Sequence, residues 1–226
     1  MKYLKPYKIF EGSYEVRERV SNRRDRAKAA IPEFISKMSE VIETNYEIYD
    51  IDENLIMDRL KSYLTADKGK EKIEYKEICD TTDVNNTGRV ISLILNFGYS
   101  IGYYQADTMS FPKDLDIYFT DWVRDIIKCL HYEKVSDNKL SYNGPTVLSS
   151  SVTASSFDTK RQIDNMDDMI ERYYNGDSEI GEISVIIGCI YQYGYGLGND
   201  TAYMVTMDKT DKLRDALKKG ETPEGW

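Results

Sequence analysis

The chain has 226 residues, of which 41% are hydrophobic and 31% charged, a balance typical of a protein that folds around an apolar core. Its formal net charge of −9 argues against a protein whose main partner is the phosphate backbone of nucleic acid, because such binding depends on clustered Lys and Arg. The longest apolar runs, residues 90–97 and 183–190, are far shorter than the roughly 20 residues needed to cross a bilayer, so no membrane span is expected.

The N-terminal region, residues 1–31, is predicted to contain an extended arm followed by a basic helix. Pro6 lies in the mixed first eleven residues, which we therefore expect to be extended. Between residues 13 and 30, six Lys and Arg, among them Arg17, Arg23 and Arg24, would surround most of a helix. Such a cluster could pair with acids of the same molecule, or contact another protein or a second copy of the chain. Nucleic acid is the least favoured partner.

A series of helices is predicted after this region. Pro32 fits the first turn of a new helix, in which apolar residues recur at helical spacing to about Asn45. Asp52 is the expected N-cap of the next helix, whose buried side runs from Leu55 to Leu64. Residues 114–134 have the clearest amphipathic pattern of the chain and predict a further helix.

Residues 83–90 resemble the first part of an EF-hand calcium loop. Oxygen-bearing side chains stand at its first, third and fifth positions, namely Asp83, Asn85 and Thr87, and a glycine stands at the sixth. The twelfth position is Ile94, which cannot supply the bidentate carboxylate that closes the coordination shell. A turn that caps the next helix explains the same residues, so calcium binding is only the weaker alternative.

Two segments of equal length, residues 88–107 and 181–200, share one pattern. Each begins at a glycine, runs apolar, turns into a mixture of Tyr and Gly, and ends at Asp. Their length without an internal turn signal favours buried helices, although their β-branched content leaves strands, and hence an α+β fold, as the alternative. In a helix, Gly98 and Gly102 would leave one face bare for the close approach of a neighbouring backbone.

Two further matches flank these segments in the same order, residues 58–67 with 168–177 and residues 120–128 with 210–218. We therefore predict an internal duplication and a mainly α fold, in which two related helical units surround the central glycine-bearing helices. The first unit spans residues 32–135, and the second, shorter unit spans residues 158–226 with a C-terminal tail. A Ser/Thr-rich connector at 136–157, expected to form a loop or a small β element, joins them.

Tyrosine is over-represented, with 19 residues against six Phe and two Trp. A ring that carries a hydroxyl can line the boundary of a core or form part of a protein interface. If their rings are exposed, binding is expected on the tyrosines of the two glycine-bearing segments, namely Tyr99, Tyr103, Tyr104, Tyr191, Tyr193 and Tyr195.

Few residues suggest catalysis. His131 is the only histidine, and the three cysteines are widely separated, which excludes a zinc site of several His or paired Cys and fits reduced thiols in the cytoplasm. Asp164, Asp167 and Asp168 fall on one face of a predicted helix and could hold Mg²⁺ or act as an acid–base pair, although a solvated helix face is the favoured explanation. Under the main hypothesis neither a cofactor nor a catalytic residue is expected.

The first eleven residues, MKYLKPYKIFE, resemble the start of many uncharacterised proteins encoded by large tailed bacteriophages. The resemblance implies a setting in an infected bacterium, either the host cytoplasm or the virion, and no activity. Our first hypothesis is a non-enzymatic protein–protein interaction factor with an accessory, structural or host-modulating role. The alternatives are a carboxylate-dependent enzyme that uses Mg²⁺ and an acidic inhibitor that mimics DNA.

Overall fold

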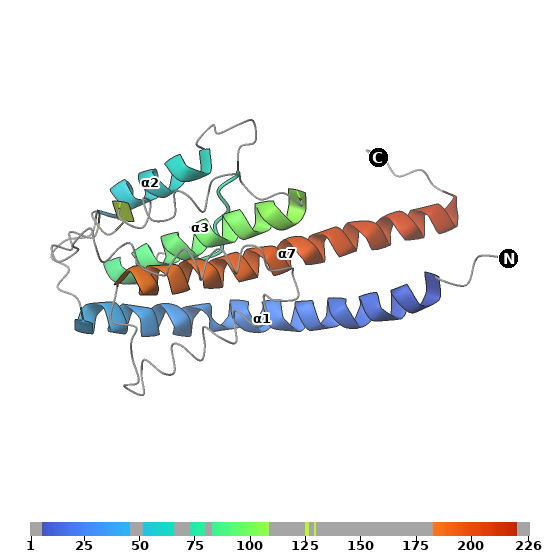
Figure 1. Ribbon diagram of the computed structural model, residues 1–226, viewed down its shortest axis with the longest axis horizontal. Coiled ribbons are helices and arrows are strands. Elements are labelled where there is room, and N and C mark those ends of the chain that lie inside the picture. The colour runs from blue at the N-terminus through green and yellow to red at the C-terminus, as the bar shows by residue number, and fades with distance from the viewer. Residues whose placement is uncertain are drawn as a thin grey trace.

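The computed structural model describes residues 6–45, 52–65, 73–79, 83–108, 125–126, 129 and 183–220 (Figure 1). The labelled helices within these ranges are α1 (Pro6–Asn45), α2 (Glu53–Thr65), α3 (Asn86–Thr108) and α7 (Ile183–Lys219). No described residue belongs to a β-strand. The prediction of a mainly α fold is confirmed, and nothing in the described part of the chain supports the α+β alternative.

The centre of the molecule is the pair formed by α3 and α7, which lie side by side and run in the same direction (Figure 1). All residues of α3 from 90 to 102 are buried, as are all residues of α7 from 189 to 198. A helix that is buried all round lies inside a core rather than at a surface. The prediction that the two glycine-bearing segments are buried central helices is therefore confirmed.

Glycines bring the two helix backbones into direct contact. A Cβ atom added to Gly98 would overlap the carbonyl oxygen of Tyr191, and one added to Gly102 would overlap the carbonyl oxygen of Tyr195. Backbone atoms cannot rotate away as side-chain ends do, so only the absence of a Cβ atom permits this distance between the helices. The bare helix face expected at these two glycines is present, and α7 occupies it.

The contact is reciprocal. On α7, a Cβ atom on Gly194 or Gly198 would overlap the carbonyl oxygens of Leu95 and Tyr99. Each residue of α3 has an equivalent on α7 whose number is 96 higher. With this offset, the contacts of the two α3 glycines correspond to the contacts of the two α7 glycines. This corrects the alignment of residues 88–107 with 181–200, which implies an offset of 93, because the glycine contacts rather than the segment ends fix the register. Common ancestry of the two helices stays a prediction.

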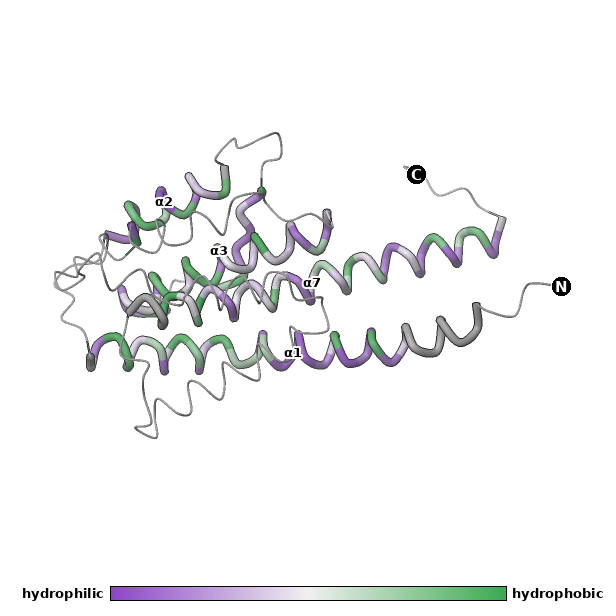
Figure 2. Tube along the Cα trace, viewed as in Figure 1, coloured by the Kyte–Doolittle hydropathy of each residue, from purple (hydrophilic) through white to green (hydrophobic). Residues whose placement is uncertain are grey.

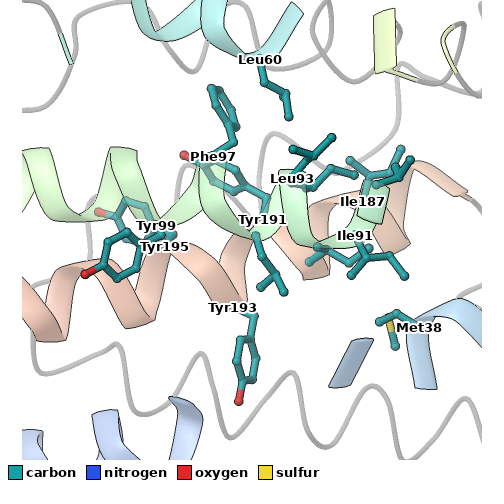
Figure 3. Close-up of a cluster of buried hydrophobic side chains, with 14 of the residues drawn as sticks. Met38, Leu60, Ile91, Leu93, Phe97, Tyr99, Ile187, Tyr191, Tyr193 and Tyr195 are labelled. Carbon is teal, nitrogen blue, oxygen red and sulfur yellow. The ribbon is translucent and has the colours of Figure 1, made fainter. Parts of the chain in front are cut away.

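Equivalent rings of the central pair point to different neighbours. Figure 3 shows Phe97 directed from α3 towards Leu60 of α2, whereas Tyr193, its equivalent on α7, points towards α1. The ring of Tyr193 stacks on Phe34 of α1 with 4.4 Å between centroids. Its hydroxyl donates a hydrogen bond of 2.8 Å to the carbonyl oxygen of Ala27. Helix α2 thus covers one side of the central pair, and α1 covers the other.

Helix α1 is continuous over 40 residues, with Pro32 in its interior. This corrects two predictions, since residues 6–11 are helical rather than extended and no new helix begins at Pro32. A proline inside a helix costs about 3 kcal/mol. Tertiary burial outweighs that cost, so the boundary predicted between residues 31 and 32 falls within one helix. The buried apolar residues recur on both sides of the proline and are Val20, Ala27, Ile31, Phe34, Ile35, Met38, Val41 and Ile42.

Helix α2 begins at the predicted cap. The side chain of Asp52 accepts a hydrogen bond of 3.0 Å from the backbone N–H of Leu55. Ile56, Leu60 and Leu64 are buried as predicted, whereas Leu55 is 40% exposed and does not belong to the buried side. The cap leaves Leu55 in the first turn, ahead of the residues that pack on α3.

Buried polar residues of α3 hold the non-helical segment 73–79. The backbone N–H of Lys76 donates to Ser100 Oγ at 2.7 Å, and that of Ile78 donates to Asn96 Oδ1 at 2.9 Å. Among the described residues the segment has no neighbouring β-strand, and these side chains accept the hydrogen bonds that such a strand would accept. The same bonds give the buried Ser100 and Asn96 side chains a partner.

The remaining domain predictions fall largely outside the described residues. This applies to the connector 136–157 and to residues 158–182 of the second unit. Of the helix predicted over 114–134, Asp125, Ile126 and Cys129 are described, and all three are helical.

Candidate functional site

Helices α1 and α7 continue beyond the end of α3 as a two-helix arm (Figure 1). In the 96-residue register, the last residue of α3, Thr108, is level with Met204, so α7 extends past α3 from residue 205 to residue 219. We define the arm as residues 6–26 of α1 and 200–219 of α7, which run in opposite directions. Figure 2 shows that hydrophobic residues of α1 gather in its other half, beside α3, whereas hydrophilic residues prevail in the coloured part of α1 that belongs to the arm.

A buried ion pair joins the two helices at the base of the arm. Arg23 and Asp200 form a two-pronged pair, with 2.6 Å between Nε and Oδ2 and a second contact between Nη2 and Oδ1. Their side chains are only 11% and 1% exposed. Burial raises the pKa of Asp200, while the hydrogen bond and charge of Arg23 oppose that shift. The pair therefore fixes α1 against α7 at one position.

Further ion pairs follow towards the end of the arm. Arg17 pairs with both Asp208 and Asp211 of α7, and Arg214 pairs with Asp211 at 2.9 Å. Arg24 pairs with its neighbour Asp25 at 2.8 Å. Among the arginines predicted as binding residues, Arg17, Arg23 and Arg24 are thus all paired within the molecule. Arg23 is also too deeply buried to contact a partner, which corrects that prediction.

Most of the tyrosines predicted as a binding surface lie in the core. Tyr99, Tyr191, Tyr193 and Tyr195 are buried, so the condition under which binding was expected on them, exposed rings, is not met. Their position between the packed helices explains this, since a helix that is buried all round places every ring against a neighbour. Figure 3 shows Tyr99 and Tyr195 beside each other between α3 and α7.

Tyr103 and Tyr104 are the half-buried members of the predicted set. The ammonium group of Lys76 lies 3.2 Å from the centre of the Tyr103 ring, in a cation–π arrangement. Any binding on the predicted tyrosines is therefore restricted to the last turns of α3.

The arm carries two exposed hydrophobic side chains that sequence reasoning missed. Tyr14 of α1 is 70% exposed, and Leu217 of α7 is 63% exposed. Leu55 on α2 is the third large hydrophobic residue found exposed in the described ranges. Tyr14 falls off the apolar stripe of α1, and this departure from helical spacing was a signal available in the sequence, whereas Leu217 follows Leu213 at helical spacing and gave no such signal.

The residues of the suspected calcium loop serve as a helix cap. Asn85 Oδ1 accepts a hydrogen bond of 2.8 Å from the backbone N–H of Gly88, and Asn85 Nδ2 donates one of 2.8 Å to Glu43 Oε1. Thr87 is buried, and Asp83 is exposed. Within the described ranges no group of three or more His, Cys, Asp and Glu is placed to hold a metal ion. The alternative catalytic residues Asp164, Asp167 and Asp168 lie outside the described residues.

The described thiols are expected to be unreactive in the folded protein. Burial raises the pKa of Cys79 and of Cys189 to about 12, and it also raises that of Cys129. At pH 8 only roughly one in ten thousand of the first two thiols is then a thiolate, the form that attacks an alkylating reagent. We expect iodoacetamide to modify the native protein at least about a hundred-fold more slowly than the same protein in guanidinium chloride, measured by mass spectrometry. Rapid labelling of a native thiol at these positions would contradict the burial.

No helix within the described ranges is both long enough and apolar enough to cross a membrane. Comparison with protein-family models, with characterised proteins and with solved structures finds no match to this chain, so its function is inferred from the arrangement of its own residues.

Proposed function

We propose that the protein is a non-enzymatic interaction factor whose two-helix arm docks on an acidic surface of a partner protein. The observation that carries the proposal is the continuation of α1 and α7 beyond α3, with Tyr14 and Leu217 exposed on it. Both side chains are accessible to a partner, and burying them in a complex would remove their apolar surface from water.

The charge of the arm favours an acidic partner. Residues 6–26 contain six Lys and Arg against four Asp and Glu, and residues 200–219 contain five against four. The arm is therefore positive by three charges in a chain with a net charge of −9. Two arms would repel each other, whereas an acidic protein surface would attract an arm at long range. The intermixed acids argue against nucleic acid, which prefers an unbroken basic stripe.

The ion pairs of the arm support a docking role because they reduce its flexibility. Arg17 and Arg23 each bridge α1 to α7. A preformed surface loses less conformational entropy on binding than a flexible one does. The sequence resemblance adds the proposed setting, in which a phage accessory, structural or host-modulating protein acts in the host cytoplasm or is carried in the virion.

The test compares arm variants of the full chain in quantitative capture from bacterial cells, with a tag on either terminus in turn. Tyr14→Ala/Leu217→Ala is expected to reduce recovery of a stoichiometric partner about ten-fold or more, because both side chains would lose buried contacts. Leu55→Ala is the matched control, since it removes an exposed leucine from α2. Recovery should also fall with added salt.

Three results would count against this function. One is equal recovery with Tyr14→Ala/Leu217→Ala and with wild type. Another is a partner whose binding does not change with salt. A third is light scattering that shows a stable dimer of the chain, because the partner would then be a second copy rather than another protein.

A further inference from the structure

Residues 73–79 pack on α3 without forming a helix. The N–H of Lys76 donates to Ser100 Oγ at 2.7 Å, and the same hydroxyl donates to the carbonyl oxygen of Lys76 at 3.4 Å. The N–H of Ile78 donates to Asn96 Oδ1 at 2.9 Å. In an extended chain the N–H and C=O groups of one residue point to the same side, and every second residue repeats that direction. Lys76 and Ile78 follow this pattern, with both N–H groups towards α3.

The spacing of the two acceptors on α3 fits an extended chain. Asn96 and Ser100 are four residues apart, which is about 6 Å along a helix axis. Two residues of an extended chain span about 6.6 Å, so the N–H groups of Lys76 and Ile78 recur at nearly the same distance. The order of the bonds shows that the segment runs in the opposite direction to α3. Residues 76–78 therefore form an extended strand that is held on one side by a helix.

The other side of this strand carries the backbone groups of Tyr75 and Glu77. Because adjacent residues of an extended chain alternate, these N–H and C=O groups point away from the acceptors on α3. In the described part of the chain, no hydrogen bond reaches any of these four groups, which we call the outer edge. The edge is closed before Tyr75, since the N–H of Ile73 donates to the carbonyl oxygen of Leu64 in α2 at 3.3 Å. Unpaired backbone groups on an extended segment are a template for a further strand.

Acidic side chains flank the outer edge on both faces. Glu74 and Glu77 are exposed, and residues three apart in an extended chain lie on opposite faces. Neither carboxylate forms an ion pair with another described residue. Lys76, the cation of the segment, holds its ammonium group 3.2 Å from the centre of the Tyr103 ring on α3. The outer edge therefore attracts a basic chain and repels a second acidic edge.

We propose that the outer edge binds an extended, basic segment of a partner protein by β-strand addition. The two N–H and two C=O groups of Tyr75 and Glu77 pair with the backbone of the added strand. Glu74 and Glu77 each meet a Lys or Arg, and these two basic residues stand three apart in the partner, one on each face of its strand. The site is separate from the arm and does not depend on it.

The first test is amide hydrogen exchange of the free protein, followed by NMR. After correction for intrinsic rates, the amides of Lys76 and Ile78 should exchange at least about ten-fold more slowly than those of Tyr75 and Glu77. The reason is that only the first two have acceptors within the described part of the molecule. Equal exchange of all four amides would overturn the proposal, since the two sides of the strand would then not differ.

The second test is an NMR titration of the full chain with the peptide acetyl-Thr-Lys-Val-Val-Lys-Thr-amide, whose lysines are three residues apart. We expect the amides of Tyr75 and Glu77 to shift downfield with a Kd on the order of 1 mM. The same peptide with both valine amides N-methylated should bind at least about ten-fold more weakly, because each edge of its strand is then blocked. The peptide with glutamate in place of lysine should be weakened as much. Equal binding of the three peptides, or no response to the first, would overturn the proposal.

Two proline variants separate binding from folding. Glu77→Pro removes an N–H of the outer edge, and an extended segment tolerates proline where that group points outwards. It should unfold at the same denaturant concentration as wild type and bind the peptide at least about ten-fold more weakly. Ile78→Pro removes the N–H that donates to Asn96, so it should unfold at a lower denaturant concentration. Wild-type peptide binding by Glu77→Pro would overturn the proposal, as would equal destabilisation by the two prolines.

The role of charge is tested with Glu74→Gln/Glu77→Gln, which should weaken peptide binding about ten-fold. Glu15→Gln/Glu18→Gln is the matched control, because it removes the same charge from exposed positions of α1 and should leave the affinity unchanged. Equal effects of the two variants would contradict a local attraction at the outer edge. Light scattering decides whether a second copy is the occupant. A dimer that Glu77→Pro abolishes would assign the outer edge to self-association and overturn the proposal.

Discussion

Gly98→Ala is expected to lower the free energy of unfolding by about 3 kcal/mol or more, although alanine at an exposed helix position is about 1 kcal/mol better than glycine. The added Cβ atom would overlap the carbonyl oxygen of Tyr191, a backbone atom that cannot move without displacing α7. The amide nitrogen of Tyr195 would lie 3.0 Å from the same Cβ atom, so a small rotation of α3 provides no space. Chemical denaturation followed by circular dichroism measures the loss.

Because the contact is reciprocal, a substitution on α7 tests it from the other side. Gly194→Ala should cost about as much as Gly98→Ala, because its Cβ atom would overlap the carbonyl oxygen of Leu95 in the equivalent way. Lys212→Ala is the control, an exposed residue of α7 whose replacement should change stability by less than about 0.5 kcal/mol. Wild-type stability in either glycine variant would show that the two backbones do not lie in contact.

The central pair was largely predictable from the sequence because its signals are local. A long apolar segment without turn residues indicates a buried helix, and Gly98 and Gly102 mark the face that a second backbone approaches. The caps at Asp52 and Asn85 also follow from local chemistry. The 96-residue register was missed, since the segments were matched by their ends, and the ends of a helix do not determine which of its residues face a partner.

The errors in α1 have a different origin. Local geometry disfavours a proline inside a helix, so Pro32 was interpreted as the first turn of a new helix and Pro6 as part of an extended arm. Burial of the apolar stripe of α1 against α3 and α7 is a tertiary effect, and it exceeds the local cost. Sequence periodicity across Pro32 carried this information, because Ala27, Ile31 and Phe34 already continue one helical face.

The candidate site was the least predictable part because its residues are brought together from distant positions. The basic residues of α1 were recognised, and pairing within the molecule was one of the outcomes foreseen. Which acids they meet could not be predicted, since Arg23 and Asp200 are 177 positions apart. The tyrosines were predicted by composition, which does not distinguish a buried ring such as Tyr195 from an exposed one such as Tyr14.

A double-mutant cycle on the buried ion pair is expected to show strong coupling. Arg23→Met leaves a buried carboxylate without its counter-charge, and Asp200→Leu leaves a buried guanidinium. Each should lower the free energy of unfolding by about 3–5 kcal/mol. Arg23→Met/Asp200→Leu removes both charges together with their desolvation cost, so its stability should return to within about 1 kcal/mol of wild type. Denaturant titration of the four proteins measures the coupling.

An exposed pair on α1 provides the control for this cycle. Glu15 and Arg19 lie 3.5 Å apart, and their side chains are 72% and 76% exposed. Solvent screens such a pair, so Glu15→Leu and Arg19→Met should couple by less than about 0.5 kcal/mol. Equal coupling in the two cycles would mean that Arg23 and Asp200 are not held in a buried pair.

The pH dependence of the same variants gives an independent measure of burial. Burial raises the pKa of Asp200 in the folded protein, and Arg23 opposes the shift only in part. A carboxyl whose pKa is higher in the folded than in the unfolded state contributes stability at low pH, and this contribution is lost as the pH rises through the raised value. Arg23→Met removes the opposing attraction, so its stability should fall more steeply than that of wild type as the pH rises above the ordinary pKa of an aspartate, 3.8. The double variant has no carboxyl at this position and should lack that slope. The same slope in Arg23→Met and in the double variant would show that the Asp200 carboxyl is solvated, and the ion pair would then not lock the base of the arm.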